Sequence, residues 1–151
     1  MSTFEALSTP TISAAAYTAN DVIGGLQSFT FNGLLKPGGI LDDIIIYDSL
    51  DIKASLSLHL YDSLPTEIVD ADPYAPADGD IQNKWLRSYV AVNTYQDLGG
   101  IAVVSLAEFL TRASLNVPFK GRTLWLHALT VATPTYGATT GLSFKLKVRD
   151  S

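Results

Sequence analysis

The sequence contains no cysteine, little charge of either sign and few basic residues. Without cysteine the chain has no disulfide, no thiol nucleophile and no cysteine metal ligand. Only 10 residues are Lys or Arg against 15 Asp or Glu, so the net charge of −5 argues against a protein that binds nucleic acid through phosphate contacts. A charged fraction of 17% and a mean hydropathy of +0.21 argue against disorder. No run approaches the roughly 20 apolar residues of a membrane-spanning helix, so we expect no membrane partner.

Residues that carry out catalysis are equally scarce. The two histidines, His59 and His127, lie far apart and in no metal-binding pattern. No serine stands in a G-x-S-x-G elbow, and no glycine-rich phosphate loop is present. The aspartates between Asp70 and Asp80 resemble pieces of a calcium loop, but Tyr74 occupies the third ligand position. We therefore predict a protein that is not an enzyme and that holds no cofactor and no metal ion.

The chain does contain apolar and polar residues that alternate with a period of two, which is typical of β-strands. The alternation is clearest in residues 142–149, where every second side chain is apolar. It recurs where Leu56, Leu58 and Leu60 are separated by polar neighbours. Each of these strands is expected to turn one face to a core and the other to water.

Two other runs, 40–47 and 123–131, are apolar on both faces, which indicates strands that are covered on both sides. Further strand candidates, rich in aromatic and β-branched residues, are 27–31, 87–92 and 101–106. Helix is expected only in the short stretches 78–86 and 105–112. The pattern predicts an all-β fold: a jelly-roll-like antiparallel β-sandwich with little helix.

The first 23 residues are small, polar and weakly patterned. We expect residues 1–23 to form an extended N-terminal arm outside the core, and residues 24–151 to form the β-sandwich domain. Such an arm would become ordered on contact with a partner or with a neighbouring copy. The domain is expected to fold without it.

Charge is unevenly distributed along the chain. Six carboxylates and no basic residue lie in the acidic segment (residues 62–80), and its three prolines keep the segment out of regular structure. From Arg112 onward six basic residues face only Asp150. Two interpretations remain open at this point. The charged stretches either only meet water, or they form surfaces that contact another copy of the chain or a charged partner.

Seven stretches of strand and turn carry a further signal. They are residues 17–25, 38–41, 44–48, 56–62, 70–75, 123–126 and 142–148. Together they resemble the auxiliary capsid proteins of tailed bacteriophages, which are called decoration, cement or head-stabilisation proteins. The resemblance runs from about Tyr17 to the end of the chain.

This resemblance implies a structural protein that binds the outside of the phage head and stabilises the capsid by bridging subunits of the major capsid protein. It also implies a homo-oligomer, a dimer or a trimer, that is made in the host cytoplasm and resides on the virion surface. The candidate contacts with the capsid or with another copy are Tyr17, Asn20, Asp21, Asp70, Asp72, Tyr74, Trp85, Lys145, Lys147 and Arg149.

Exposed aromatic rings suggest an alternative function. Trp85, Tyr89 and Tyr95 lie close together in sequence, and carbohydrate-binding sandwiches stack sugars on such rings. The competing interpretation is that the three rings belong to the core or to an interface. A carbohydrate-binding β-sandwich module is therefore the second hypothesis.

Overall fold

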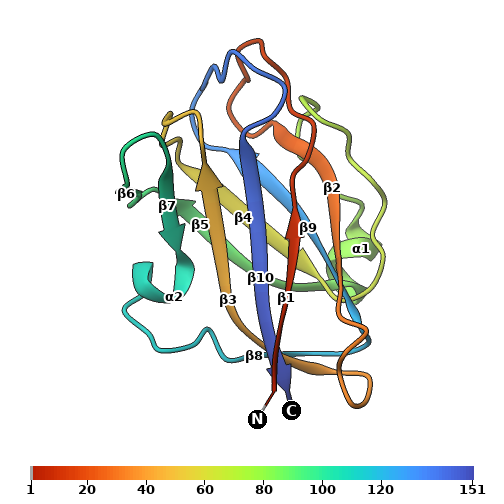
Figure 1. Ribbon diagram of the computed structural model, residues 1–151. Coiled ribbons are helices and arrows are strands. Elements are labelled where there is room, and N and C mark those ends of the chain that lie inside the picture. The colour runs from red at the N-terminus through yellow and green to blue at the C-terminus, as the bar shows by residue number, and fades with distance from the viewer. Residues whose placement is uncertain (1) are drawn as a thin grey trace.

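Two antiparallel sheets packed face to face make up the computed structural model, which describes residues 2–151 (Figure 1). The elements are β1 (Thr3–Ser8), β2 (Val22–Thr30), β3 (Gly39–Asp48), β4 (Leu56–Tyr61), α1 (Asp78–Asn83), β5 (Trp85–Val92), β6 (Gln96–Asp97), β7 (Ala102–Ser105), α2 (Leu106–Phe109), β8 (Val117–Phe119), β9 (Thr123–Thr130) and β10 (Leu142–Asp150).

The front sheet has the strand order β1-β10-β3-β7-β6, and β8 pairs with β3 near the end where β3 begins. The back sheet has the order β2-β9-β4-β5. All neighbouring strands are antiparallel. The predicted all-β antiparallel sandwich with little helix is thus confirmed. Both short helices also lie where the sequence predicts them, although each is shorter.

The core lies between the two sheets and is built from the alternation seen in the sequence. In β10, Leu142, Phe144, Leu146 and Val148 are fully buried, while the residues between them lie on the outer face of the front sheet. In β4 the three leucines point into the core from the back sheet. The second half of β9 is buried on both faces, as the apolar run in the sequence predicts.

The expected N-terminal arm is wrong, because residues 3–23 belong to the sandwich. β1 pairs with β10 over all six of its residues, from Thr3 opposite Arg149 to Ser8 opposite Phe144. The expected domain boundary at residue 23 falls inside β2. The sequence pattern did not predict β1, because the core-facing positions of this strand carry only one large apolar side chain, Phe4.

The segment between β1 and β2 is also part of the core. Ile12 and Tyr17 are buried, and their backbone N–H groups donate to carbonyls of the loop that precedes β10, at Thr139 (2.9 Å) and Pro134 (3.0 Å). Buried side chains and paired backbone groups fix this segment in place, although most of its residues are small or polar.

Candidate interaction surfaces

The acidic segment lies over the outer face of the back sheet. The backbone N–H of Ile68 donates to Nε2 of His127 on β9 (3.2 Å), and the ring of Tyr74 stacks on the ring of His59 on β4 (4.6 Å between centroids). Both histidines alternate with core residues along their strands, so they point away from the core. The acidic segment therefore covers the side of the back sheet that water would otherwise reach.

A hydrogen bond between side chains also holds the acidic segment to this face, because the hydroxyls of Tyr61 and Tyr74 are hydrogen-bonded to each other. Within the back sheet, His59 Nδ1 lies 2.6 Å from Ser88 Oγ. Because His127 Nε2 accepts from a backbone N–H, its proton must lie on Nδ1, which faces the Tyr61 hydroxyl at 3.5 Å. His127 thus anchors the segment as a neutral acceptor, and His59 anchors it by stacking on Tyr74.

Burial changes the protonation of these anchoring groups. It lowers the pKa of His127 to about 4, with a smaller effect from neighbouring His59, and it also lowers the pKa of His59. Burial raises the pKa of the Tyr61 hydroxyl. In contrast, the hydrogen bond from Lys84 holds the pKa of Asp80 well below its usual range. At neutral pH the cluster therefore contains two uncharged histidines, two protonated tyrosines and one ion pair.

The start of the chain holds the other side of the acidic segment. Asp70 accepts hydrogen bonds from the Tyr17 hydroxyl and from the backbone N–H of Gly24, both at 2.7 Å. The backbone N–H of Tyr74 donates to the carbonyl of Asn20 (2.9 Å). The structure thus brings together six of the ten candidate contacts: Tyr17, Asn20, Asp21, Asp70, Asp72 and Tyr74.

Two of these six side chains are inside the protein. Tyr17 is 2% exposed and Asp21 is 6% exposed, and the Asp21 carboxylate accepts from the backbone N–H of Thr18 (2.9 Å). Their expected role as surface contacts is therefore wrong. Both side chains make their contacts within the chain, because residues 3–23 pack against the core instead of forming an arm.

A tight turn forms the exposed tip of the acidic segment. The backbone N–H of Asp72 donates to the carbonyl of Val69 (3.2 Å), and Ala71 adopts a left-handed φ of 66°. Val69 is exposed at this tip, between the exposed carboxylates of Glu67 and Asp72. Within residues 2–151 neither carboxylate has an ion-pair partner. The turn therefore presents an apolar side chain with two acidic ones beside it.

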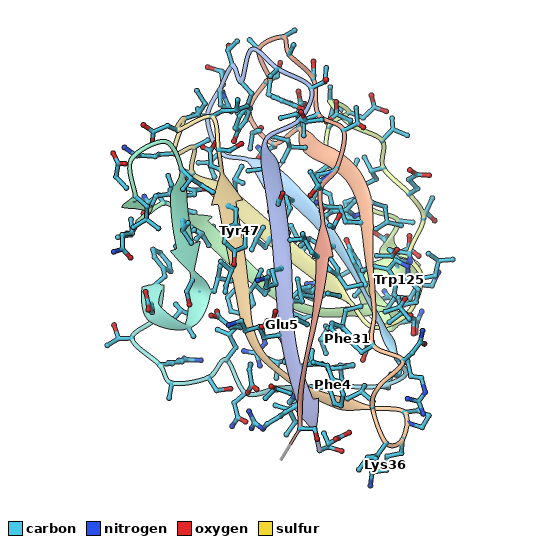
Figure 2. All side chains as sticks on the ribbon, in the orientation of Figure 1. Phe4, Glu5, Phe31, Lys36, Tyr47 and Trp125 are labelled. Atoms are coloured by element: carbon cyan, nitrogen blue, oxygen red, sulfur yellow. The ribbon has the colours of Figure 1, made fainter. Side chains whose placement is uncertain are left out.

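Lys145, Lys147 and Arg149 lie on the opposite side of the molecule, on the outer face of the front sheet. Each already lies near a carboxylate. The ammonium groups of Lys145 and Lys147 are 3.5 and 3.7 Å from the carboxylate of Glu5, and Arg149 pairs with Asp42. Figure 2 shows Glu5 on β1 at this face. The predicted basic surface is thus neutralised in part within the chain.

A shallow cavity of about 340 Å³ lies on the same outer face. Leu7, Tyr47, Ile101, Ser143 and Lys145 line it, and the Lys145 ammonium is 5.3 Å from the centre of the Tyr47 ring. Neither Leu7 nor Tyr47 is among the candidate contacts predicted from the sequence. The signal for Tyr47 was its place in a strand expected to be covered on both faces, whereas Leu7 lay in the expected arm.

The three candidate stacking rings differ in exposure. Trp85 is 43% exposed, and its Nε1 donates to Ser88 Oγ (2.8 Å), which fixes the orientation of the ring. Tyr89 is buried, and Tyr95 packs against the core with its hydroxyl donating to the carbonyl of Ala54 (2.9 Å). Only Trp85 is therefore placed to stack on a ligand.

Within residues 2–151 no group of three or more His, Asp or Glu side chains is arranged to hold a metal ion. None of the described helices is long and apolar enough to cross a membrane. No family model, curated protein or solved structure matches the chain.

Proposed function

We propose that the protein is a structural component of a tailed-phage head that binds the outside of the capsid and stabilises it by bridging major capsid protein subunits. The observation that carries the proposal is the rigid acidic turn on the back sheet. Two of the stretches that carry the resemblance, 17–25 and 70–75, pack against each other and hold this turn in place. A preformed turn loses little conformational entropy on binding.

The strand order supports a jelly roll as the form of the sandwich. The first four strands along the chain alternate between the two sheets, and each of the last two strands inserts between earlier ones: β10 between β1 and β3, and β9 between β2 and β4. Two packed sheets whose strands alternate and interleave in this way are typical of a jelly roll. This fold gives a stiff platform with one outer face covered and the other open.

In the proposed mechanism, Glu67, Val69 and Asp72 contact a basic and partly apolar surface of the shell. One such contact is weak because exposed ion pairs contribute little. Capsid symmetry presents many equivalent sites, and an oligomer that engages two or more of them gains in effective affinity. Bridging of this kind connects neighbouring capsid subunits without any chemical step.

The test is to add purified protein to expanded capsids that lack it and to measure occupancy and the melting temperature of the heads. We expect saturable binding and a higher melting temperature. Glu67→Lys and Asp72→Lys should each weaken binding, whereas Glu108→Lys, an exposed change of the same charge on α2, should not. Background occupancy with unchanged head melting would refute the proposal.

Trp85 supports the second candidate, a carbohydrate-binding module. Its ring is exposed and its orientation is fixed by Ser88, as a sugar-stacking ring requires. Titration with glycans should then shift the intrinsic fluorescence of the wild type, and Trp85→Ala should lose the response while the variant stays folded. No shift with a broad glycan set would leave this function without support.

A further inference from the structure

The edges of the two sheets differ in how well they are protected. An exposed edge strand presents unpaired N–H and C=O groups, and proteins usually shorten, bend or cover such edges. On the front sheet, β6 has two residues and β8 has three, of which one is Pro118. On the back sheet, β5 changes register twice against β4, and Ala91 within it has a left-handed φ of 55°. These three edges are short or irregular.

The edge formed by β2 is covered and bulged. The backbone groups of Val22 bond with Asp72 and Ala71 of the acidic segment, both at 2.8 Å. Gly24 and Gly25 follow with left-handed φ values of 82° and 67°, and the register against β9 shifts between Ile23 and Gln27. A bulge of this kind twists the strand and prevents regular pairing along it.

β1 is the exception. Its six residues pair with β10 in one unbroken register. Across the described part of the chain, no backbone group of β1 bonds to an element other than β10. Every residue of β1 is at least partly exposed, and the Leu7 side chain is 61% exposed. Figure 1 shows β1 as the outermost strand of the front sheet on its side. This edge is therefore long, straight and open.

We propose that β1 pairs antiparallel with β1 of a second copy of this chain, so that two front sheets join across a two-fold axis. A two-fold axis places the same strand edge on both sides of the interface, so one contact satisfies the open edge of each copy. Backbone hydrogen bonds supply the attraction, and the outward side chains set the register. This inference does not depend on the capsid role.

The side chains of β1 favour one register. Thr3, Glu5 and Leu7 share the outer face, and directly opposite residues in an antiparallel pair lie on the same face. An axis at Glu5 would place two carboxylates opposite each other, which is unfavourable. An axis at Phe4 would leave Leu7 without a partner on β1. An axis at Ala6 instead places Glu5 of each copy opposite Leu7 of the other.

Charge complementarity supports the same register. Lys145 is the β10 partner of Leu7, so an axis at Ala6 brings Glu5 of one copy toward Lys145 of the other. Within one copy, the single carboxylate of Glu5 is shared between two lysines at 3.5 and 3.7 Å, so it does not neutralise both of them. The interface would also cover the exposed Leu7 and continue into the cavity beside Tyr47. A second copy thus fits this edge in backbone pairing and charge.

The first test is hydrogen exchange of the wild-type protein, measured residue by residue over a range of concentrations. Alternate amides of β1 point away from β10. We expect these amides to become protected over the concentration range in which sedimentation experiments show that the protein dimerises. The amides that point toward β10 should be protected at all concentrations. A monomer throughout, or a dimer in which the outward amides of β1 stay unprotected, would overturn the proposal.

The second test is a charge exchange between copies. Glu5→Lys and Lys145→Glu should each weaken self-association by roughly tenfold, because each places like charges across the axis. An equimolar mixture of the two variants should associate again, because opposite charges then meet across the axis while the pair inside each chain stays broken. Glu108→Lys and Lys36→Glu are the matched controls and should dimerise as the wild type does (Figure 2 shows Lys36 far from Glu5). Variants that associate equally well alone and mixed would refute the register.

Discussion

Gln27 on β2 combines burial with unsatisfied hydrogen-bonding groups. It is 4% exposed and lies opposite Leu126, whose side chain belongs to the core. Neither its amide nitrogen nor its amide oxygen has a hydrogen-bond partner. Desolvation of an unpaired amide is unfavourable, whereas an apolar side chain of similar size gains from the same environment.

We therefore predict that Gln27→Leu raises the free energy of unfolding by roughly 1–3 kcal/mol. Urea denaturation followed by circular dichroism measures the change. Gln96→Leu, at an exposed position on β6, is the control and should change stability by less than about 0.5 kcal/mol. A destabilised Gln27→Leu would mean that the amide has a partner essential to the fold.

Ala71 adopts a left-handed backbone conformation at the tip of the acidic segment, with a φ of 66°. This conformation costs an L-residue with a Cβ roughly 1–2 kcal/mol, whereas glycine adopts it without a steric penalty. Since glycine also loses more entropy on folding, we predict that Ala71→Gly stabilises the protein by roughly 0.5–1 kcal/mol. Ala113→Gly, in an exposed loop and without a positive φ, should give no gain in the same thermal unfolding experiment.

At the scale of elements, the acidic segment and the back sheet depend on each other. The segment has almost no regular structure of its own, and it is ordered by contacts with β2, β4 and β9. His127 on the outer face of β9 is in turn buried beneath Ile68 and Tyr74 of the segment. Release of the segment would therefore expose His127.

His127 makes this docking sensitive to acid. Its pKa is lowered to about 4 in the folded protein from an ordinary value of 6.5, so protonation favours the unfolded state. The contribution of His127 to the free energy of unfolding should be fully present above about pH 6.5. The free energy of unfolding should then fall as the pH drops toward 4, by an amount on the order of 3 kcal/mol. His127→Gln accepts the Ile68 hydrogen bond without titrating and should flatten the pH dependence. His59→Gln separates the contribution of the second histidine, and identical pH profiles for wild type and His127→Gln would contradict the assignment.

The predictability of each element follows from how its residues are patterned. In β10 and β4, large apolar residues occupy every core position, so alternation alone predicted the strands. In β1 the only large side chain at a core-facing position is Phe4. The strand forms because β10 supplies its pairing partner, and no local pattern in the sequence shows this pairing. The apolar run of β9 did predict a cover on its outer face. The identity of that cover required contacts between residues far apart in sequence, such as Ile68 and His127.

The candidate site was predictable to a smaller extent. The acidic segment was visible as a charge run with prolines, and it does form an exposed surface with Glu67 and Asp72 at its tip. The basic surface was predicted only in part, because Glu5 and Asp42 reach the basic residues from other strands. The resemblance points to Tyr17 and Asp21 as surface contacts, yet the turns of their segment fold back onto the core. Composition indicates charge, but pairing decides how much of that charge a partner meets.

At the scale of the whole molecule, the N-terminal residues are structural. β1 closes one side of the front sheet, Phe4 packs against the core, and the Phe4 ring lies so close to Gly33 that a Cβ there would clash with it at 2.6 Å. Ile12 and Tyr17 then fill the core at the end of the molecule where β10 begins. The opposite ends of the chain are thus joined in one sheet, because β1 and β10 are neighbours.

Deletion of residues 2–8 should therefore destabilise the domain rather than remove a passive tail. The deletion leaves the β10 edge unpaired and exposes apolar surface that Phe4 and Ala6 cover, which together should cost about 3–5 kcal/mol in the free energy of unfolding. Phe4→Ala alone should cost about 2 kcal/mol, and Leu7→Ala, whose side chain is mostly exposed, should cost less than about 0.5 kcal/mol.

Denaturation of the four proteins at a concentration where the wild type is monomeric measures these effects without a contribution from self-association. A deletion variant as stable as the wild type would show that β1 contributes nothing to the monomer and serves only in contacts between molecules. Truncation destabilises the fold and removes the open edge at the same time, so a loss of capsid binding in a truncated protein would not show which of the two changes caused it. Leu7→Glu does separate them: it leaves β1 paired with β10 but places a carboxylate opposite Glu5 of the second copy, which is unfavourable across the proposed axis.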